Sequence, residues 1–293
     1  PIDSLARIAD IIGRIPSVER LVVIPYVSEN PDIGAIPNAV MMGDFKSDAD
    51  GLEIDFAQLP FDHPLYVMYS SGTTGLPKGI LHTHAMRAAQ MDRVTPNDYD
   101  YHARTLLSTP LYSNTTIVSF MPTLFGGSTV YLMPKFDARG YLAIVEAERI
   151  THTMLVPVQY KRIMDVPDFD SFDLTSMRVK FSTSAPLRAD VKRDVLARFP
   201  GKLIEYYGLT EGGGVTVLVG SDHPDKLHTV GTPVPNSDIR LIDEAGREVP
   251  QGEVGEICGR SPTMMAGYYG RDDLTEDFIW RNAEGDVYFR SGD

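Results

Sequence analysis

The feature that most restricts how this sequence can fold is a repeated alternation of short apolar strands with helix-like segments through its middle. An alternation of this kind predicts a largely parallel sheet covered by helices. The predicted fold class is therefore α/β. The expected strand and helix ranges, in pairs, are 66–69 and 85–94, 105–109 and 116–125, 129–133 and 138–150, 153–156 and 158–164, and 178–182 and 187–199, followed by a strand at 203–206.

The flanking regions follow different patterns. Apolar residues at helical spacing predict a helix over residues 2–15, and a β-branched run predicts a strand over 21–27. A long surface connection is expected over 28–60. After about residue 215, short strands separated by turn residues indicate a smaller β-rich subdomain, a partial barrel.

We therefore predict an α/β region over residues 1–220 and a β-rich subdomain over 221–293. The chain begins at Pro1 rather than at a methionine, and it ends at Asp293 directly after an alternating apolar run. Both ends look cut, so we expect a piece of a longer protein whose α/β region is truncated at its N-terminus.

The charge balance argues against one class of function. The 293 residues carry 27 basic and 40 acidic side chains, a net charge of −13, and such a surface repels nucleic acid. Residues 1–60 and 221–293 are strongly acidic and residues 61–220 are nearly neutral, so only the middle suits an anionic ligand. No apolar stretch approaches the roughly 20 residues that a membrane span needs. A single cysteine, Cys258, fits a reducing compartment, so we expect a cytoplasmic protein.

The segment from Tyr69 to Gly79 has the composition of a loop that holds phosphate groups. Its glycines permit close approach to a ligand, its hydroxyls and backbone N–H groups can bond phosphate oxygens, and Lys78 adds a mobile positive charge. The loop follows the predicted strand 66–69, and we expect it to lead into a helix. The residues expected to contact phosphate are Ser70, Ser71, Gly72, Thr73, Thr74, Gly75 and Lys78.

Two other interpretations of this loop are weaker. A solvated surface connection has a similar composition, but three glycines and a lysine after a buried strand favour a phosphate site. The P-loop of nucleotide hydrolases places lysine directly after its second glycine, whereas Lys78 comes three residues after Gly75 and is followed by Gly79. A phosphotransferase or an ATPase is therefore the weaker alternative.

The loop resembles the phosphate loop of the adenylate-forming superfamily, which includes acyl-CoA synthetases, adenylation domains of peptide synthetases and luciferases. Further segments resemble motifs of that family and occur in the family's order. Ordered matches over about 225 residues make a chance resemblance negligible. These segments are 182–187, 206–211, 255–257, 267–269 and 290–293.

The resemblance implies a two-step ligation in a region that binds nucleotide and acyl groups. A carboxylate attacks the α-phosphorus of ATP to give acyl-AMP and pyrophosphate, and a thiol, usually that of coenzyme A, then displaces AMP. The implied partners are a small-molecule carboxylic acid, ATP and coenzyme A, with Mg²⁺ bound beside the phosphates. Neither nucleic acid nor a membrane span is expected.

The resemblance also assigns roles in phosphate binding. The loop from Ser70 to Lys78 would hold the β- and γ-phosphates, which leave as pyrophosphate. Thr210 would bond the α-phosphate, and Glu211 would help to bind Mg²⁺, which prefers carboxylate and phosphate oxygens. Lys78, Thr210 and Glu211 are thus the candidate catalytic residues.

The nucleoside end of ATP has its own implied contacts. Tyr207 would stack on the base, beside Gly208. Asp293 would accept hydrogen bonds from the ribose hydroxyls, which suits an acceptor-only carboxylate. The residues expected to lie along the adenine are Ser184, Ala185 and Pro186.

The order of the motifs also suggests walls for the acyl pocket. Family members often carry a histidine where this chain has Ser113, so a contact of imidazole with the substrate is not expected. Amino-acid-activating members commonly carry an aspartate close by, but no acid occurs from Leu111 to Phe136. We therefore expect a fatty, aromatic or dicarboxylic acid without an α-amino group. The candidate pocket residues are Tyr112, Asn114, Val156, Gln159 and Ser182.

In the family, the chain continues past the match to Asp293 into a mobile domain whose lysine contacts the reacting groups, and this sequence supplies no such domain. We expect the fragment to bind nucleotide with weak or no turnover. Two alternatives stay open. One is a catalytically silent nucleotide-binding module, and the other is an adenylation domain that delivers the acyl group to a carrier-protein thiol.

Overall fold

The computed structural model describes residues 4–25, 28–46, 53, 55–70 and 77–293, with side chains described from residue 7 onward. Contacts divide the chain into two compact units, residues 1–58 and 59–293. Among the described residues, no helix has both the length and the apolar character needed to cross a membrane.

The first unit contains two helices and a pair of short parallel strands. The predicted helix and first strand are present, although the strand ends earlier than expected. The second strand and helix fall within the predicted surface connection, because three-residue strands are too short to show a pattern. The elements are α1 (Ser4–Gly13), β1 (Leu21–Val23), β2 (Ala39–Met41) and α2 (Met42–Phe45).

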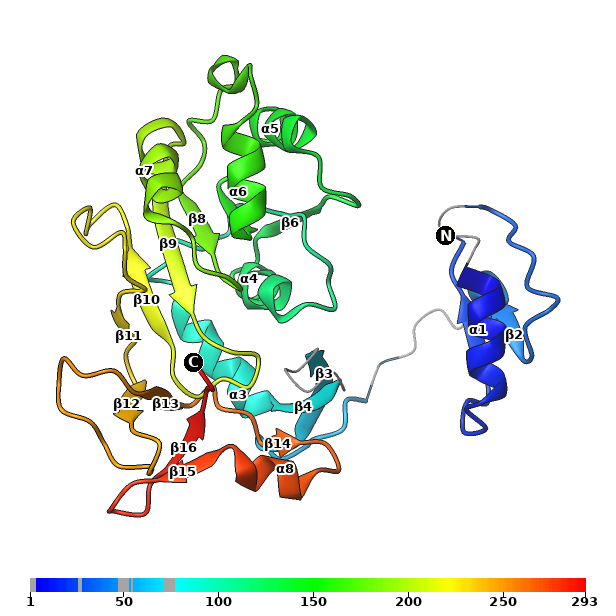
Figure 1. The fold of residues 1–293 in the computed structure, drawn as a ribbon. Helices are drawn as coiled ribbons and strands as arrows, with labels where there is room; N and C mark the ends of the chain where they lie inside the picture. The colour runs from blue at the N-terminus through cyan, green and yellow to red at the C-terminus, as the bar shows by residue number, and fades with distance from the viewer. Residues whose placement is uncertain (1–3, 26–27, 47–52, 54, 71–76) are drawn as a thin grey trace. The chain divides into compact units, whose positions relative to one another are not determined.

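A seven-stranded sheet in the order β11-β10-β9-β8-β7-β5-β6 is the framework of the second unit (Figure 1). Strands β5 to β9 are parallel, β10 is antiparallel to β9, and β11 is antiparallel to β10. The predicted α/β class with a largely parallel sheet is confirmed. The strands are β5 (Arg104–Leu107), β6 (Thr129–Leu132), β7 (His152–Leu155), β8 (Val179–Ser182), β9 (Lys202–Tyr207), β10 (Thr216–Val219) and β11 (Thr232–Pro233).

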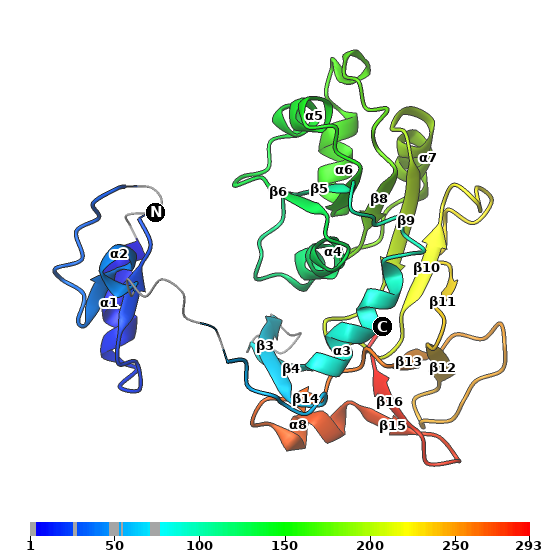
Figure 2. The same ribbon diagram turned by 180° about the vertical axis from the view of Figure 1, so that it is seen from behind.

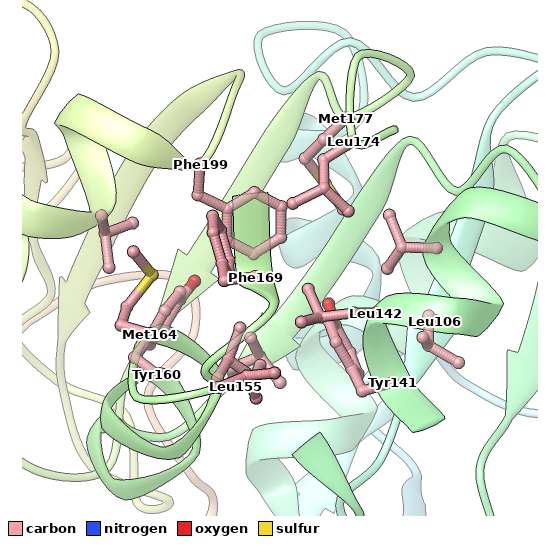
Figure 3. Close-up of a cluster of buried hydrophobic side chains, with 14 of the residues drawn as sticks. Leu106, Tyr141, Leu142, Leu155, Tyr160, Met164, Phe169, Leu174, Met177 and Phe199 are labelled. Atoms are coloured by element: carbon pink, nitrogen blue, oxygen red, sulfur yellow. The ribbon is translucent and has the colours of Figure 1, made fainter. Parts of the chain in front are cut away.

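Both faces of this sheet are buried, because successive side chains of a strand point to opposite faces. Leu106 lies in one core with side chains of three helices, part of which is drawn in Figure 3. Leu107 lies in a second core that packs against a fourth helix. Strands buried on both faces have continuous apolar sequences, which explains why the sequence revealed them. The three helices are α5 (Ala138–Ala147), α6 (Pro157–Met164) and α7 (Ala189–Arg198), and the fourth is α4 (Asn114–Phe125); η2 (Phe169–Ser171) follows α6.

A three-stranded antiparallel sheet, in the order β14-β4-β3, stands apart from the large sheet. The predicted loop joins the two strands of a hairpin, so a strand that was not predicted lies between the loop and the helix expected over 85–94, which is present. The second strand shows only two consecutive apolar residues, Ile80 and Leu81, which is too short a run to distinguish it from a helix start. The elements are β3 (Pro64–Ser70), β4 (Lys78–Thr83) and β14 (Gly267–Tyr268), with α3 (His84–Ala89) and η1 (Gln90–Arg93) after β4.

The last part of the chain forms a four-stranded antiparallel sheet in the order β12-β13-β16-β15, which is not a closed barrel. Its β-rich character agrees with the sequence pattern. However, β10 and β11 belong to the large sheet, and the domain boundary at residue 220 stays a prediction. The elements are β12 (Asp238–Ile242), β13 (Glu256–Arg260), α8 (Asp272–Asp277), β15 (Ile279–Arg281) and β16 (Val287–Arg290).

Candidate active site

A cavity of about 790 Å³ lies where the three sheets of the second unit meet. Its walls include the carboxyl ends of β8 and β9, and ligands of open α/β sheets bind at such ends. The C-terminus lies beside α3 in both views (Figures 1 and 2), and both contribute to the lining. The residues predicted from the sequence that line the cavity are Ser70, Lys78, Asn114, Ser184, Tyr207, Gly208, Thr210, Glu211 and Asp293.

Strand β4 brings Lys78 to the cavity wall. Lys78, Ile80 and His82 are buried on one face of this strand, because side chains alternate along it. The Lys78 Nζ lies 4.0 Å from the centroid of the Phe278 ring and 5.2 Å from that of Tyr268. Aromatic faces attract an ammonium group. Lys78 forms no ion pair with the residues that the structure describes, so its charge is available to an anionic ligand.

The phosphate loop itself is only partly described. Ser70 pairs in register with Lys78, so the two ends of the loop are held side by side. Ser70 and Lys78 both line the cavity. The other predicted phosphate contacts lie outside the described residues, and they are Ser71, Gly72, Thr73, Thr74 and Gly75.

The segment after β9 meets the end of the chain. The Tyr207 hydroxyl donates a hydrogen bond to Asp293 Oδ2 at 2.8 Å. Burial, together with the nearby Asp293 carboxylate, raises the pKa of Tyr207 to about 12, so the phenol stays a donor at neutral pH. The two residues expected to hold the nucleoside are thus in direct contact, although they are 86 positions apart in the sequence.

Glu211 is buried at the wall of the same cavity. Its Oε1 accepts a hydrogen bond of 2.9 Å from the Tyr268 hydroxyl, and its backbone carbonyl accepts one of 2.7 Å from the Met265 N–H. Burial and the Glu211 carboxylate raise the pKa of Tyr268 well above its usual range. Tyr268 is not among the site residues predicted from the sequence, but it both orients Glu211 and faces Lys78.

A buried network behind Thr210 was not predicted. His82 Nε2 donates to the Thr210 carbonyl at 2.9 Å, so its Nδ1 is free to accept from an Arg87 guanidinium nitrogen at 2.7 Å. The same nitrogen donates to Asn114 Oδ1 at 2.8 Å. Burial and the neighbouring Arg87 lower the pKa of His82 to about 4, which keeps the imidazole neutral.

This network fixes the position of the Thr210 backbone through His82 and Arg87, which do not line the cavity. Only the alternation of Lys78, Ile80 and His82 could have pointed to it, and that pattern is informative only once the segment is known to be a strand. The contact between His82 and Thr210 spans 128 positions, so no local pattern could reveal it.

The predicted adenine contacts lie at the carboxyl end of β8. Ser184 lines the cavity, and its hydroxyl is hydrogen-bonded to the Thr115 hydroxyl. Its φ of 76° is in the left-handed region, which is uncommon outside glycine and frequent at functional sites. Ala185 and Pro186 follow it as exposed residues that do not line the cavity.

Of the residues predicted for the acyl pocket, the structure brings only Asn114 to the cavity. Tyr112 is 84% exposed. Gln159 is buried and bridges Val156 and Ser108, since its Oε1 accepts from the Val156 N–H and its Nε2 donates to Ser108 Oγ, each at 3.1 Å. Ser182 is buried at the end of β8, and its hydroxyl has no partner among the described residues.

Several residues that were not predicted from the sequence also line the cavity, and they include a run along α3 and η1. Met86, Gln90 and Arg93 follow one another at spacings of four and three, so they share one helical face. Val118 of α4 and Met154 of β7 form an apolar wall of the same cavity.

Residues 24–269 match the family model of AMP-binding enzymes. The chain is 36% identical over 223 residues to a medium/long-chain-fatty-acid–CoA ligase of Mycobacterium tuberculosis, covering 75% of the chain and 39% of that protein. It is 35% identical over 235 residues to a feruloyl-CoA synthase of an Amycolatopsis species, covering 79% of the chain and 47% of that protein. The chain therefore spans less than half the length of these relatives.

Solved structures agree with these sequence relationships. An amide bond synthetase from Marinactinospora thermotolerans superposes with a TM-score of 0.77 at 26% identity, covering 98% of the chain and 57% of the synthetase. An ATP-bound MatB from Rhodopseudomonas palustris gives a TM-score of 0.76 at 26% identity, covering 97% and 58%. The family match, the order of the motifs and the cavity that gathers them lead to one conclusion: the chain belongs to the AMP-binding enzymes of the adenylate-forming superfamily.

Proposed function

We propose that the protein containing this chain activates a carboxylic acid with ATP and transfers the acyl group to coenzyme A. The observation that carries this proposal is the single cavity lined by Lys78, Tyr207, Thr210, Glu211 and Asp293. The relatives named as CoA ligases support the choice of acceptor. The single cysteine fits a cytoplasmic location, which is part of the proposal.

Two displacements make up the reaction. First, a carboxylate oxygen bonds to the α-phosphorus, the bond from that phosphorus to the bridging oxygen breaks, and pyrophosphate leaves. Second, the thiol sulfur bonds to the acyl carbon, the bond from that carbon to the AMP oxygen breaks, and the thiol proton passes to solvent. Negative charge develops around the phosphates in the first step, so fixed donors and cations there lower the barrier.

The described residues suit these tasks. Lys78 offers a cation at the end of the loop, where the departing phosphates would lie. Thr210 offers a hydroxyl at the cavity wall, beside a backbone carbonyl that His82 holds in place. Tyr207 and Asp293, already hydrogen-bonded to each other, present a ring and a carboxylate to the nucleoside.

Magnesium would be held largely by the nucleotide. In the described part of the chain, no group of three or more histidine, cysteine, aspartate or glutamate side chains could hold a metal ion by itself. Mg²⁺ typically keeps several waters and takes one or two protein carboxylates plus substrate phosphates. Glu211 has one oxygen occupied by Tyr268, which leaves Oε2 for this role and fits such a site.

The decisive experiment is acid-dependent exchange of labelled pyrophosphate into ATP by the whole protein, with a broad panel of carboxylic acids. We expect exchange with at least one acid, AMP as the nucleotide product, and a thioester once coenzyme A is added. Exchange without any thioester, but with transfer to a carrier-protein thiol, would identify the alternative acceptor. No exchange with any acid, or release of orthophosphate, would contradict the proposal.

A matched pair of variants keeps this experiment specific. Thr210→Val should lower the exchange rate by about 10²–10³-fold, the typical cost of one lost donor at a reacting centre. Thr175→Val removes the same group from an exposed site outside the cavity and should leave the rate unchanged. For the chain by itself, the proposal predicts that ATP and AMP bind but that there is little or no turnover. Calorimetry measures this binding.

A further inference from the structure

Arg93, at the end of η1, is a cation that is paired with neither of the acidic residues lining the cavity, Glu211 and Asp293, in the described structure. It is partly buried and lines the 790 Å³ cavity at the far end of the run formed by Met86 and Gln90. Its guanidinium carbon lies 4.9 Å from the centroid of the Tyr206 ring. Its guanidinium forms no hydrogen bond or ion pair with any residue in the described ranges, although Asp92 is its neighbour in sequence; its backbone carbonyl accepts from the Asn97 N–H.

The surroundings of Arg93 favour an oxygen-bearing ligand. The Tyr206 hydroxyl accepts a hydrogen bond of 3.1 Å from Asn97 Nδ2, so its own proton is free to be donated. Val118 and Met154 form the apolar wall beside this pair. A guanidinium beside an apolar wall strongly favours an anion, because burying an unpaired charge is costly. Burial lowers the pKa of Arg93, which reports the same cost.

Arg93 also borders two cavities. A second cavity of about 400 Å³ shares Arg93, Tyr206 and Thr263 with the first. Along this face, Arg93 is seven residues beyond Met86, a separation of roughly 10–13 Å at about 1.5 Å per residue in α3 and about 2.0 Å per residue in the 3-10 turn η1. His82, directly before this helix, holds the Thr210 carbonyl. The run therefore leads away from Thr210 along the cavity wall, and an acyl group bonded at the α-phosphate would reach Arg93 by extending along this wall.

We propose that Arg93 determines substrate specificity by binding a second carboxylate at the far end of the acid, so that the substrate is a dicarboxylic acid. This inference rests on the proposed function, because it takes the acyl group to be joined to AMP in this cavity. Arg93 would form charge-assisted hydrogen bonds to the distal carboxylate, and the Tyr206 hydroxyl would donate a further one. Among the fatty, aromatic and dicarboxylic acids that the sequence left open, this selects one class.

The test uses two stable analogues of acyl-AMP, acyl-sulfamoyl adenosines that differ only at the far end of the acyl chain. One ends in a carboxylate and the other in the isosteric, uncharged carboxamide, over a series of chain lengths. Calorimetry measures their binding, and that of AMP, to the chain. At the best length we expect the carboxylate to bind at least tenfold more tightly, the ratio that a charge-assisted bond supplies.

Variants of Arg93 assign the effect to this residue. Arg93→Met should reduce the carboxylate-to-carboxamide ratio to about one, and Arg93→Lys should keep part of it, with AMP affinity unchanged in both as a check on folding. Arg139→Met removes an arginine that is paired with Asp168 and does not line the cavity, so it should not change the ratio. Equal binding of the two analogues, or a preference that survives Arg93→Met, would overturn the inference and leave the proposed function standing. Failure of AMP and of both analogues to bind would overturn the proposed function, and this inference with it.

Discussion

Lys78 is buried between two aromatic rings and pairs with no acidic side chain among the described residues. If it binds the phosphates that leave as pyrophosphate, Lys78→Ala should weaken ATP binding roughly 10–100-fold, since a hydrogen bond to a charged group contributes about 1.5–3 kcal/mol. AMP lacks these phosphates, so its affinity should change less than about twofold. Calorimetric titration of both nucleotides measures the difference.

The control for this prediction is Lys161→Ala. Lys161 is exposed and forms an ion pair with Asp165 within one turn of helix, so its loss should change neither affinity. Equal loss of ATP and AMP binding by Lys78→Ala would contradict the assignment, because it would mean that the cavity wall itself had changed.

At the scale of elements, a buried ion pair joins α7 to β9. Lys192 and Glu205 are each less than 5% exposed, and Glu205 Oε1 also accepts the Leu187 N–H at 2.8 Å. Lys192→Met would leave the carboxylate buried without its cation, so we expect a loss of about 3–5 kcal/mol in the free energy of unfolding. Urea denaturation measures it. Lys202→Met, which breaks the exposed pair with Asp98, should cost less than about 1 kcal/mol.

A second element-scale prediction concerns the connection after β9, which packs closely against the segment between β13 and β14. Gly212 has a φ of 74°, and a Cβ there would lie 1.8 Å from the Thr263 carbonyl oxygen. Gly212→Ala should therefore cost roughly 2–5 kcal/mol through backbone strain and overpacking. Gly252→Ala shares the strain, with a φ of 97°, but meets no atom within 4 Å. Thermal denaturation compares the two variants. Equal melting temperatures would contradict the prediction, because they would mean that the backbone near Thr263 moves to accept the Cβ without loss of stability.

At the scale of the whole molecule, the fold was predictable where burial is continuous along the chain. Strands such as β5 and β8 are buried on both sides, so their apolar runs are visible in the sequence. The hairpin of β3 and β4 was not predicted, because β4 has only two consecutive apolar residues, Ile80 and Leu81, and its other neighbour, β14, lies far away in the sequence. Short elements such as β2 depend on tertiary contacts rather than on a local pattern.

The site divides in the same way. Lys78, Tyr207 and Asp293 were predicted from ordered motifs and line one cavity, while their roles stay predictions. Arg93 and His82 were not found, because an arginine or a histidine acquires its role from partners distant in sequence. The order of the motifs predicted the acyl-pocket residues less well. The Gln159 side chain, for example, forms hydrogen bonds to the residues that follow β5 and β7 and does not line the cavity.

The stability of the whole molecule should fall steeply in mild acid because two histidines are buried in uncharged form. Burial lowers the pKa of His82 and of His152 to about 4 in the folded chain, against 6.5 for an exposed imidazole. Between pH 6.5 and 4, the unfolded chain binds a proton at each site that the folded chain does not. The free energy of unfolding should therefore decrease on acidification by about 2 kcal/mol per pH unit near pH 5.

The carboxylates with lowered pKa values, such as Asp273 at about 2, lose most of their contribution below about pH 4. Urea denaturation at several pH values between 7 and 4.5 measures the slope, and His82→Gln should halve it because one of the two sites is removed. His102→Gln changes an exposed histidine and should leave the slope as it is. A slope that His82→Gln does not alter would mean that this imidazole carries a proton in the folded chain. It would then have no lone pair to accept from Arg87, and the support for the Thr210 backbone would have to be reassigned.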